Sequence, residues 1–325
     1  MPTAENAKLQ YEGGQSVTAM TALTDSGDRT RFTSAAALWS QRSGYAPVIR
    51  PNGLLTGGAV GTHATDNTVT VAAMTLNLNG VVAAVNAAAP TITRPATAVA
   101  KVCSVTVNAS AAVAVVAGTD GATTAFSETR GAAGGPPLIP VDSVEIAQVR
   151  MTTSAAGKVA ATEIYQVVGL HTERADFPLY TVAYDTGSVS FLSALEAIHT
   201  GPAPKKVFAS YAAPIFADVA LASDFVPPET THSVSSTPIY GTTLGSASST
   251  LGQGAFVAYL NDGVSDALVS LKNQILWFKF FPDRYASPYL LTQGKLGISR
   301  TFPAGDSIQA ACTISSSAAA KEVTS

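Results

Sequence analysis

Charged side chains are scarce in this chain of 325 residues: Asp, Glu, Lys and Arg make up 13% of it, about half the usual share in globular proteins. The formal net charge is −3, and the chain has no cluster of Lys and Arg. Proteins that grip nucleic acid neutralise several phosphates with such clusters, so the sequence argues against this function. A surface with few charges is cheap to desolvate, which favours an oligomer.

Long apolar runs are also missing. The longest, residues 111–117, is far shorter than the roughly 20 residues that span a bilayer, and residues 1–14 lack the apolar centre of a secretory signal. We therefore expect synthesis in the cytoplasm and no membrane association. The chain has only two cysteines, Cys103 and Cys312, and each fits as a small apolar strand residue, so we do not expect a disulfide between them.

The common catalytic and nucleotide-binding motifs are absent. There is no Gly-x-Ser-x-Gly elbow, no Gly-x-x-x-x-Gly-Lys phosphate loop and no Cys-x-x-Cys pair. No two of the four histidines (His63, His171, His199 and His232) have the short spacing of a metal site. We expect no enzyme activity, no cofactor and no metal.

A few polar groups allow two interpretations. His171 and Glu173, with Asp176 nearby, could share a strand face and bind a metal, or they could be solvated residues at a domain boundary. The adjacent Lys205 and Lys206 could contact an acidic partner or keep a strand end soluble.

Carboxylates are also too scattered to single out a catalytic dyad. The candidate groups are Asp218, Asp224 and Glu229, and the pair Asp262 and Asp266. The second pair follows Asn261, in an Asn-Asp-Gly turn signature, so a turn is the simpler interpretation.

The C-terminal part of the chain alternates apolar and polar residues. The alternation occupies residues 276–281 and 296–314 and is interrupted by Pro-Asp-Arg and Pro-Ala-Gly-Asp turns. Alternation with a period of two residues is typical of β-strands. The pattern predicts a hairpin around the turn at residues 303–306, with Leu296, Ile298 and Phe302 on one face.

Both faces of the strand at residues 276–281 are apolar. Leu276, Phe278 and Phe280 share one face, and Trp277, Lys279 and Phe281 share the other. Such a strand is covered on both sides. The cover is either the core alone or the core together with a neighbouring subunit, and the sequence leaves both open.

The middle of the chain has a different composition, rich in Ala, Val, Thr and Asn and poor in aromatics. We expect residues 67–174 to form an inserted β-rich domain, with tight turns at Asn79-Gly80 and Asp120-Gly121. Its predicted strands are residues 68–78, 80–85, 101–107, 111–117, 143–152 and 163–168.

The flanks, residues 1–66 and 175–325, are expected to form one discontinuous β-sandwich or barrel, since roughly 150 residues per domain predicts two domains. Short helices are predicted at residues 33–42 and 190–199. The Thr/Ser/Gly-rich residues 230–254 hold few core-sized side chains and predict an extended loop or an exposed hairpin.

Several C-terminal motifs resemble the end of the major tail tube proteins of long-tailed (siphovirus-type) bacteriophages. They are Leu-Gly-Gln-Gly at 251–254, Phe-Pro-Asp-Arg-Tyr at 281–285, Gly-Lys-Leu-Gly-Ile-Ser at 294–299 and Pro-Ala-Gly-Asp at 303–306. The resemblance implies a mainly β fold, a tail-tube-type sandwich with a short flanking helix. The inserted domain departs from the plain family pattern, and we expect it on the outer surface.

The same resemblance implies a structural subunit of the virion tail, assembled in the host cytoplasm. Its partners would be further copies of itself in stacked hexameric rings and the tape measure, terminator and tip proteins. DNA would pass through the tube without specific binding, which suits an acidic chain. The candidate assembly residues are Trp277, Phe278, Lys279, Phe280, Phe281, Leu296, Ile298 and Phe302.

Two other functions are kept as alternatives: a receptor- or glycan-binding β-protein of the tail tip, and a capsid decoration or connector protein. A binder would show exposed aromatics on loops, and a decoration protein would form trimers on the shell or a single ring.

Overall fold

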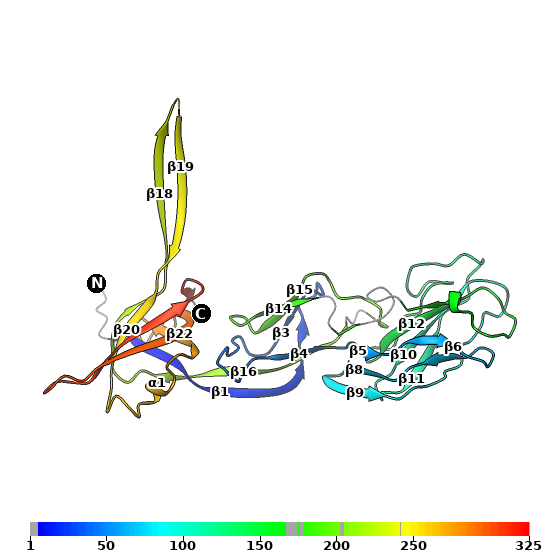
Figure 1. Ribbon diagram of the computed structural model, residues 1–325, viewed down its shortest axis with the longest axis horizontal. Helices are drawn as coiled ribbons and strands as arrows, with labels where there is room; N and C mark the ends of the chain where they lie inside the picture. The colour runs from blue at the N-terminus through cyan, green and yellow to red at the C-terminus, as the bar shows by residue number, and fades with distance from the viewer. Residues whose placement is uncertain (1–5, 167–173, 176–178, 202–204, 241, 325) are drawn as a thin grey trace. The chain divides into compact units, whose positions relative to one another are not determined.

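The computed structural model describes residues 6–166, 174–175, 179–201, 205–240 and 242–324 (Figure 1). Strands account for 51% of the chain and helices for 3%, which confirms the predicted mainly β class. The chain divides into two compact units. Unit 1 comprises residues 1–17, 38–46 and 211–325, and unit 2 comprises residues 18–37 and 47–210.

This division differs from the predicted boundaries at residues 66 and 175. Residues 47–66 and 175–210 belong to unit 2, whereas the prediction joined them to the flanks. The physical reason is strand pairing, because the strand at Gly53–Gly57 pairs with Met74–Leu78 of the middle segment. Short strands of this kind carry little sequence information about their partners.

Unit 1 is built on one antiparallel sheet, ordered β17-β20-β23-β22-β21-β1-β16, with β24 beside the first part of β22. β1 and β16 each continue into unit 2. The strands are β1 (Lys8–Ala22), β16 (Val207–Asp218), β17 (Ala222–Val226), β20 (Gly254–Tyr259), β21 (Ile275–Phe281), β22 (Tyr289–Thr301), β23 (Gln309–Ser316) and β24 (Lys321–Val323). A separate hairpin consists of β18 (Thr230–Ile239) and β19 (Thr242–Leu251).

The sheet of unit 1 curls around its own core. Phe225 of β17 stacks on Phe280 of β21 with ring centroids 4.5 Å apart, although three strands separate β17 from β21 in the sheet. Phe256 of β20 lies 5.9 Å from Phe278 of β21 in the same way. The short helix α1 (Ala267–Ser270) adds Leu268 to this core. A curled, closed core of this kind is sandwich-like.

The predicted C-terminal hairpin is confirmed. β22 and β23 pair antiparallel with Leu296 opposite Ile314 and Ile298 opposite Cys312, and all four side chains are buried. Phe302 lies one residue beyond β22 and is 57% exposed, so it does not join Leu296 and Ile298 in the core.

Unit 2 contains a two-sheet core and two further sheets. The sheets β11-β10-β12-β13 and β5-β8-β9 share one apolar cluster, which includes Val105, Ile146 and Leu76. The remaining sheets are β14-β15-β3-β2 and β6-β7. The elements are β2 (Thr24–Asp25), β3 (Arg31–Thr33), β4 (Val48–Pro51), β5 (Gly53–Gly57), β6 (Val60–Thr62), β7 (Val69–Val71), β8 (Met74–Leu78), β9 (Val81–Val85), β10 (Lys101–Val107), β11 (Val113–Ala117), β12 (Val144–Met151), the 3-10 helix η2 (Ala161–Glu163), β13 (Ile164–Tyr165), β14 (Tyr180–Ala183) and β15 (Ser188–Phe191).

Most predicted strands of the middle segment are found within two residues of their expected ends. Residues 68–78 are the exception, because they form two strands, β7 and β8, which pair with different partners. The expected strand at 163–168 begins as β13, and its residues 167–168 lie outside the described part of the chain.

The two predicted tight turns have different outcomes. Asn79 and Gly80 have φ values of 51° and 82° and join β8 to β9, as a tight hairpin requires. Asp120-Gly121 joins no two strands. There, Asp120 accepts the N–H of Ala96 and pairs with Lys101, and Gly121 donates to Ala100 O.

The two predicted helices are wrong. After β3 ends at Thr33, the chain up to residue 42 is irregular. The Ser34 hydroxyl forms hydrogen bonds with the backbone of Ala36, which compete with helix formation, and Trp39 is fully buried. Residues 190–199 continue β15 and then become irregular, since Leu195 N–H donates to Arg29 O instead of a carbonyl four residues earlier. The apolar spacing that suggested a helix arises because Phe191, Leu195 and Ile198 are each buried. Within the described residues, α1 is the only α-helix.

Candidate assembly surfaces

The hairpin β18–β19 is a separate two-stranded sheet, as Figure 1 shows. Its strands are ten residues each and pair without a break, from Thr230 opposite Leu251 to Ile239 opposite Thr242. Every residue of β18 is exposed. This confirms the predicted exposed hairpin in the Thr/Ser/Gly-rich segment.

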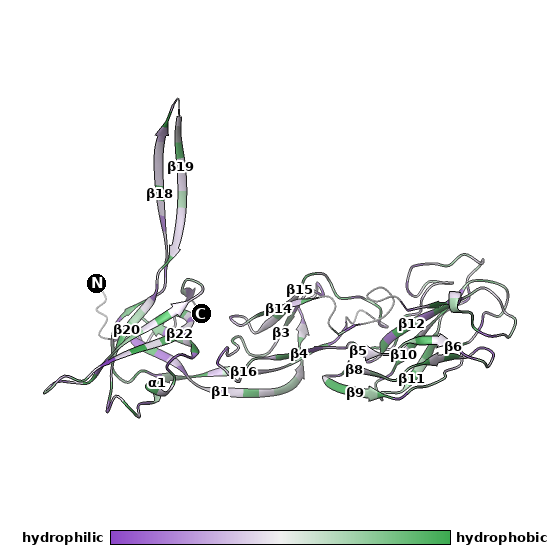
Figure 2. Cartoon of the chain, in the orientation of Figure 1, coloured by the Kyte–Doolittle hydropathy of each residue, from purple (hydrophilic) through white to green (hydrophobic). Residues whose placement is uncertain are grey.

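The hairpin carries no Asp, Glu, Lys or Arg at any position of either strand. Figure 2 accordingly colours it mostly in pale tones, interrupted by green at apolar residues. Four large apolar side chains are exposed on it: Val234, Ile239, Tyr240 and Leu244. Val234 is 79% exposed and Tyr240 is fully exposed. No charged side chain on the two strands therefore repels an approaching molecule or has to be desolvated by it.

One face of the hairpin is lined by hydroxyl groups. Directly opposite residues share a face, so Ser233 lies beside Ser248 and Ser235 beside Ser246. The hydroxyl oxygens of each pair are 2.7 Å apart and hydrogen-bonded. In each pair one hydroxyl donates and the other accepts, so covering this face leaves each of these serines with one hydrogen bond.

The aromatic strand β21 is divided between core and surface. Leu276, Trp277 and Phe278 are buried. The Trp277 indole N–H donates to Trp39 O at 2.8 Å, and Trp39 stacks on Tyr211 with ring centroids 4.9 Å apart. At this point unit 1 covers both faces of the strand with its own residues.

The last three residues of β21, Lys279, Phe280 and Phe281, are half-buried. The Lys279 ammonium lies 4.0 Å from the centroid of the Phe216 ring and 5.1 Å from that of Tyr289, and burial lowers its pKa. Phe280 belongs to the core through its stack with Phe225. For these three residues, a role in an interface stays a prediction.

A buried carboxylate in unit 1 was missed by sequence reasoning. Glu12 of β1 is fully buried and accepts hydrogen bonds from Ser40 Oγ, from Gln15 Nε2 at 2.9 Å and from Trp277 N at 3.2 Å. It therefore ties residues 38–46 to β1 and β21. A single glutamate beside two glycines gives no pattern that could reveal this contact.

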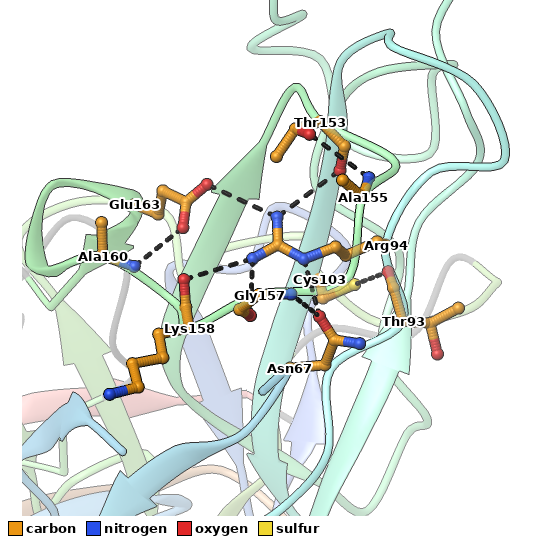
Figure 3. A network of polar contacts seen from close by, with 10 residues as sticks. All are labelled: Asn67, Thr93, Arg94, Cys103, Thr153, Ala155, Gly157, Lys158, Ala160 and Glu163. Carbon is orange, nitrogen blue, oxygen red and sulfur yellow. Dashed lines mark hydrogen bonds and ion pairs between the residues drawn. The ribbon is translucent and has the colours of Figure 1, made fainter. Parts of the chain in front are cut away.

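A polar network in unit 2 centres on Arg94, whose side chain is 6% exposed. Figure 3 shows its guanidinium directed at Asn67 Oδ1, at the carbonyl oxygens of Gly157 and Lys158, and at the Glu163 carboxylate. The Asn67 contact measures 2.7 Å and the Gly157 contact 3.1 Å. The carbonyl oxygens of Gly157 and Lys158, and that of Thr153, belong to the loop that follows β12, so the network holds that loop in place.

The three histidines that the structure describes lie apart from one another. His63 accepts the N–H of Thr65, His199 is buried with Nε2 3.1 Å from Ser143 O, and His232 is exposed on β18. Among the described residues, no group of three or more His, Cys, Asp or Glu could hold a metal ion. The proposed His171, Glu173 and Asp176 group lies outside those residues.

Four of the five carboxylates considered above make structural contacts. Asp218 pairs with Lys8, and Ser223 donates to Asp224. Asp262 and Asp266 accept backbone N–H groups in the loop between β20 and α1, which confirms the turn interpretation. The Glu229 side chain is exposed at the base of the hairpin.

The two lysines before β16 have partners within unit 2. Lys206 pairs with Asp142, and Lys205 is buried with its ammonium donating to Arg174 O at 2.6 Å. Both lie directly before β16, but the buried Lys205 does not keep the strand end soluble, and the acidic group that Lys206 contacts belongs to its own unit.

The cysteines are free and buried, Cys103 in unit 2 and Cys312 in unit 1. Burial raises the pKa of Cys312 to about 12 and also raises that of Cys103. Both are therefore packing residues with little thiolate character.

Within the described residues, no helix is long and apolar enough to cross a membrane. Comparison of the sequence with protein-family models finds no match, and comparison with curated proteins finds none either.

Proposed function

We propose that this chain is a structural subunit that assembles with copies of itself, in the manner of a phage tail tube protein that forms stacked, hexameric rings. The observation that carries the proposal is the exposed, charge-free hairpin β18–β19. The family resemblance of the C-terminal motifs supports the finer part of the proposal, the tube and the virion tail.

The hairpin supports self-assembly because it is poorly suited to exist alone in water. An isolated two-stranded sheet is marginally stable, and three or more strands or a covered face are needed for independent stability. This hairpin is ten residue pairs long and has large apolar groups at its tip. A contact that covers it would therefore stabilise both the hairpin and the assembly.

The lack of charge lowers the cost of that contact. Desolvating an unpaired charge is expensive, whereas Ser and Thr hydroxyls that are already paired cost little to cover. A neutral surface also gives DNA no cationic groups to bind, which suits a tube with a mildly acidic subunit.

Negative-stain electron microscopy with mass photometry, over a range of protein concentrations, tests the proposal. We expect six-fold rings or hollow tubes that form above a critical concentration. Replacing Tyr240 and Leu244 by Ser should raise this concentration at least tenfold, since burying such side chains contributes about 1.5–3 kcal/mol each.

The matched control is Val264→Ser, because Val264 is 71% exposed in the same unit but outside the hairpin. This variant should assemble like the wild type. A stable monomer or trimer at all concentrations would contradict the proposal and favour the tail-tip binder or the decoration protein. Tyr240 and the 82% exposed Tyr285 would then be the first residues to examine for glycan binding.

A further inference from the structure

The outer face of the unit 1 sheet gathers lysines that lie far apart in the sequence. Directly opposite residues in a sheet share a face, so the strand register assigns each side chain to one face or the other. Four lysines, one on each of four strands, lie on the face that is turned away from the core: Lys8 of β1, Lys279 of β21, Lys295 of β22 and Lys321 of β24. The described strand pairs place no aspartate or glutamate on this face, which we call the lysine face.

Aromatic rings hold two of the ammonium groups. The Lys279 ammonium lies over the rings of Phe216 and Tyr289. The Lys8 ammonium lies 5.8 Å from the centroid of the Phe281 ring. An aromatic ring attracts a cation that lies over its face. Because the rings restrict where the two ammonium groups point, less conformational freedom is lost when an anion binds there.

Lys279 has no acidic partner in the described part of the chain. The residues opposite it are Gln10 and Leu291, and its ammonium contacts the two rings. Glu12, further along β1, is buried and already accepts three hydrogen bonds. Burial lowers the pKa of Lys279, since no counter-ion offsets the cost of desolvating its charge. An anion supplied by another molecule would offset this cost.

We propose that the lysine face binds an acidic segment of another protein, with one carboxylate of that segment on the Lys279 ammonium. Lys321 is the second contact, because it lies level with Lys279 on the far side of β22, about 10 Å away at the usual strand spacing. The half-buried rings beside Lys279 contact the apolar parts of the bound side chains. This inference goes beyond the proposed self-assembly, since the hairpin β18–β19 carries none of these residues.

Carboxylates fit this face better than a nucleic acid does. Proteins that bind single strands stack bases on open aromatic faces, whereas the rings beside Lys279 and Lys8 already carry ammonium groups. The described strand pairs place no arginine on the face, although arginine is the residue that binds phosphate through two parallel hydrogen bonds. A chain with a net charge of −3 also repels a long polyanion.

A second copy of this chain does not supply a matching segment. An acidic segment carries carboxylates at adjacent or alternate positions, so that several of them can reach neighbouring lysines. The sequence has no two acidic residues at adjacent or alternate positions. The partner is therefore a different protein, and the hairpin stays the proposed contact between copies.

Fluorescence anisotropy with a labelled ten-residue oligoglutamate peptide tests the inference on dissociated full-length subunits. We expect saturable binding that weakens at least tenfold between about 0.05 and 0.3 M NaCl, because salt screens contacts between exposed charges. A Gly-Ser peptide of the same length, with the same label, should not bind. Absence of oligoglutamate binding at low salt would overturn the inference.

The substitution Lys279→Met removes the ammonium and keeps an apolar side chain against the two rings. It should raise the dissociation constant for oligoglutamate at least about fivefold. The matched control is Lys272→Met, at an exposed lysine of unit 1 that follows α1 and lies outside the lysine face. Equal binding by the two folded variants would also overturn the inference.

Tryptophan fluorescence checks that Lys279→Met keeps its fold, because Trp277 lies two residues away on the same strand. If this variant does not fold, Lys321→Met serves in its place, at an exposed position of the short strand β24. The same loss of oligoglutamate binding is expected for it, and wild-type binding would overturn the inference.

Two further results would overturn the inference and leave the proposed function intact. One is binding of a ten-nucleotide oligothymidylate as tightly as oligoglutamate, which would show that the face does not select carboxylates. The other is loss of self-assembly in folded Lys279→Met, which would show that a second copy covers the face. Failure of the wild type to assemble, with oligoglutamate binding intact, would overturn the proposed function alone.

Discussion

At the scale of single residues, unit 1 depends on a fully buried carboxylate. Glu12 accepts three hydrogen bonds, from Ser40, Gln15 and Trp277. Removing it leaves these donors without an acceptor in a place that water does not reach, which costs more than the bonds themselves contribute.

We expect Glu12→Ala to lower the free energy of unfolding of unit 1 by about 3 kcal/mol. Chemical denaturation followed by tryptophan fluorescence measures this, because the two tryptophans of the chain, Trp39 and Trp277, are both buried in unit 1. Glu229→Ala, at an exposed position of the same unit, is the control and should stay within about 0.5 kcal/mol of the wild type. Equal stability of the two variants would show that Glu12 contributes no more than a surface residue.

A second property at the scale of single residues is the dependence of the stability of unit 2 on pH, through His199. Burial is the main cause of the lowered pKa of His199, and the nearby cations Lys205 and Arg130 lower it further. The Ser143 carbonyl and Asp142 act in the opposite direction and raise it, but they do not outweigh burial. Desolvation raises the pKa of the Glu196 carboxyl, which lies near the same cations. His199 therefore binds a proton more readily in the unfolded state, where its pKa is about 6.5.

The stability that His199 confers is present above about pH 6.5 and is lost as the pH falls toward the lower folded pKa. We expect calorimetry to show the melting temperature of unit 2 falling between about pH 6.5 and 5, with a shallower fall in His199→Gln. His63→Gln, at a partly exposed histidine of the same unit, should keep the wild-type slope. Parallel slopes in all three proteins would contradict the assignment to His199.

At the scale of elements, the loop after β12 is held by one arginine rather than by regular structure. Arg94 reaches Asn67 and the carbonyl oxygens of Thr153, Gly157 and Lys158. A guanidinium offers five donors in a fixed plane, so one side chain satisfies several acceptors of an irregular loop.

We expect Arg94→Ala to expose this loop to limited proteolysis at residues 153–158 and to destabilise unit 2 by about 3 kcal/mol. Arg94→Lys keeps the charge but loses the planar fork, so its effect should be intermediate. Wild-type proteolysis of the lysine variant would show that the charge alone holds the loop.

At the scale of the whole molecule, the proposed assembly contact is neutral. Neither strand of the hairpin carries a charged residue, so ionic screening has little to act on. We expect the critical concentration for assembly to change less than about threefold between 0.05 and 0.5 M NaCl. Light scattering across this series measures it, and a tenfold loss of assembly with salt would indicate that ion pairs hold the subunits together.

The sequence by itself determined which segments are strands wherever a local pattern was strong. β10 matches residues 101–107, and the hairpin of β22 and β23 follows from alternation and a turn. These features depend on neighbours in sequence, because side-chain period and turn chemistry act over a few residues. The exposed hairpin was open to prediction for the same reason, since residues 230–254 lack core-sized side chains.

Only the tertiary structure decided which segments meet. The apolar spacing of Phe191, Leu195 and Ile198 suggested a helix, but long-range backbone bonds made that segment irregular. Burial of Glu12 beside Trp277, on strands 265 residues apart in sequence, also required the folded chain. Such contacts depend on the packing of distant segments, and no local sequence pattern records them.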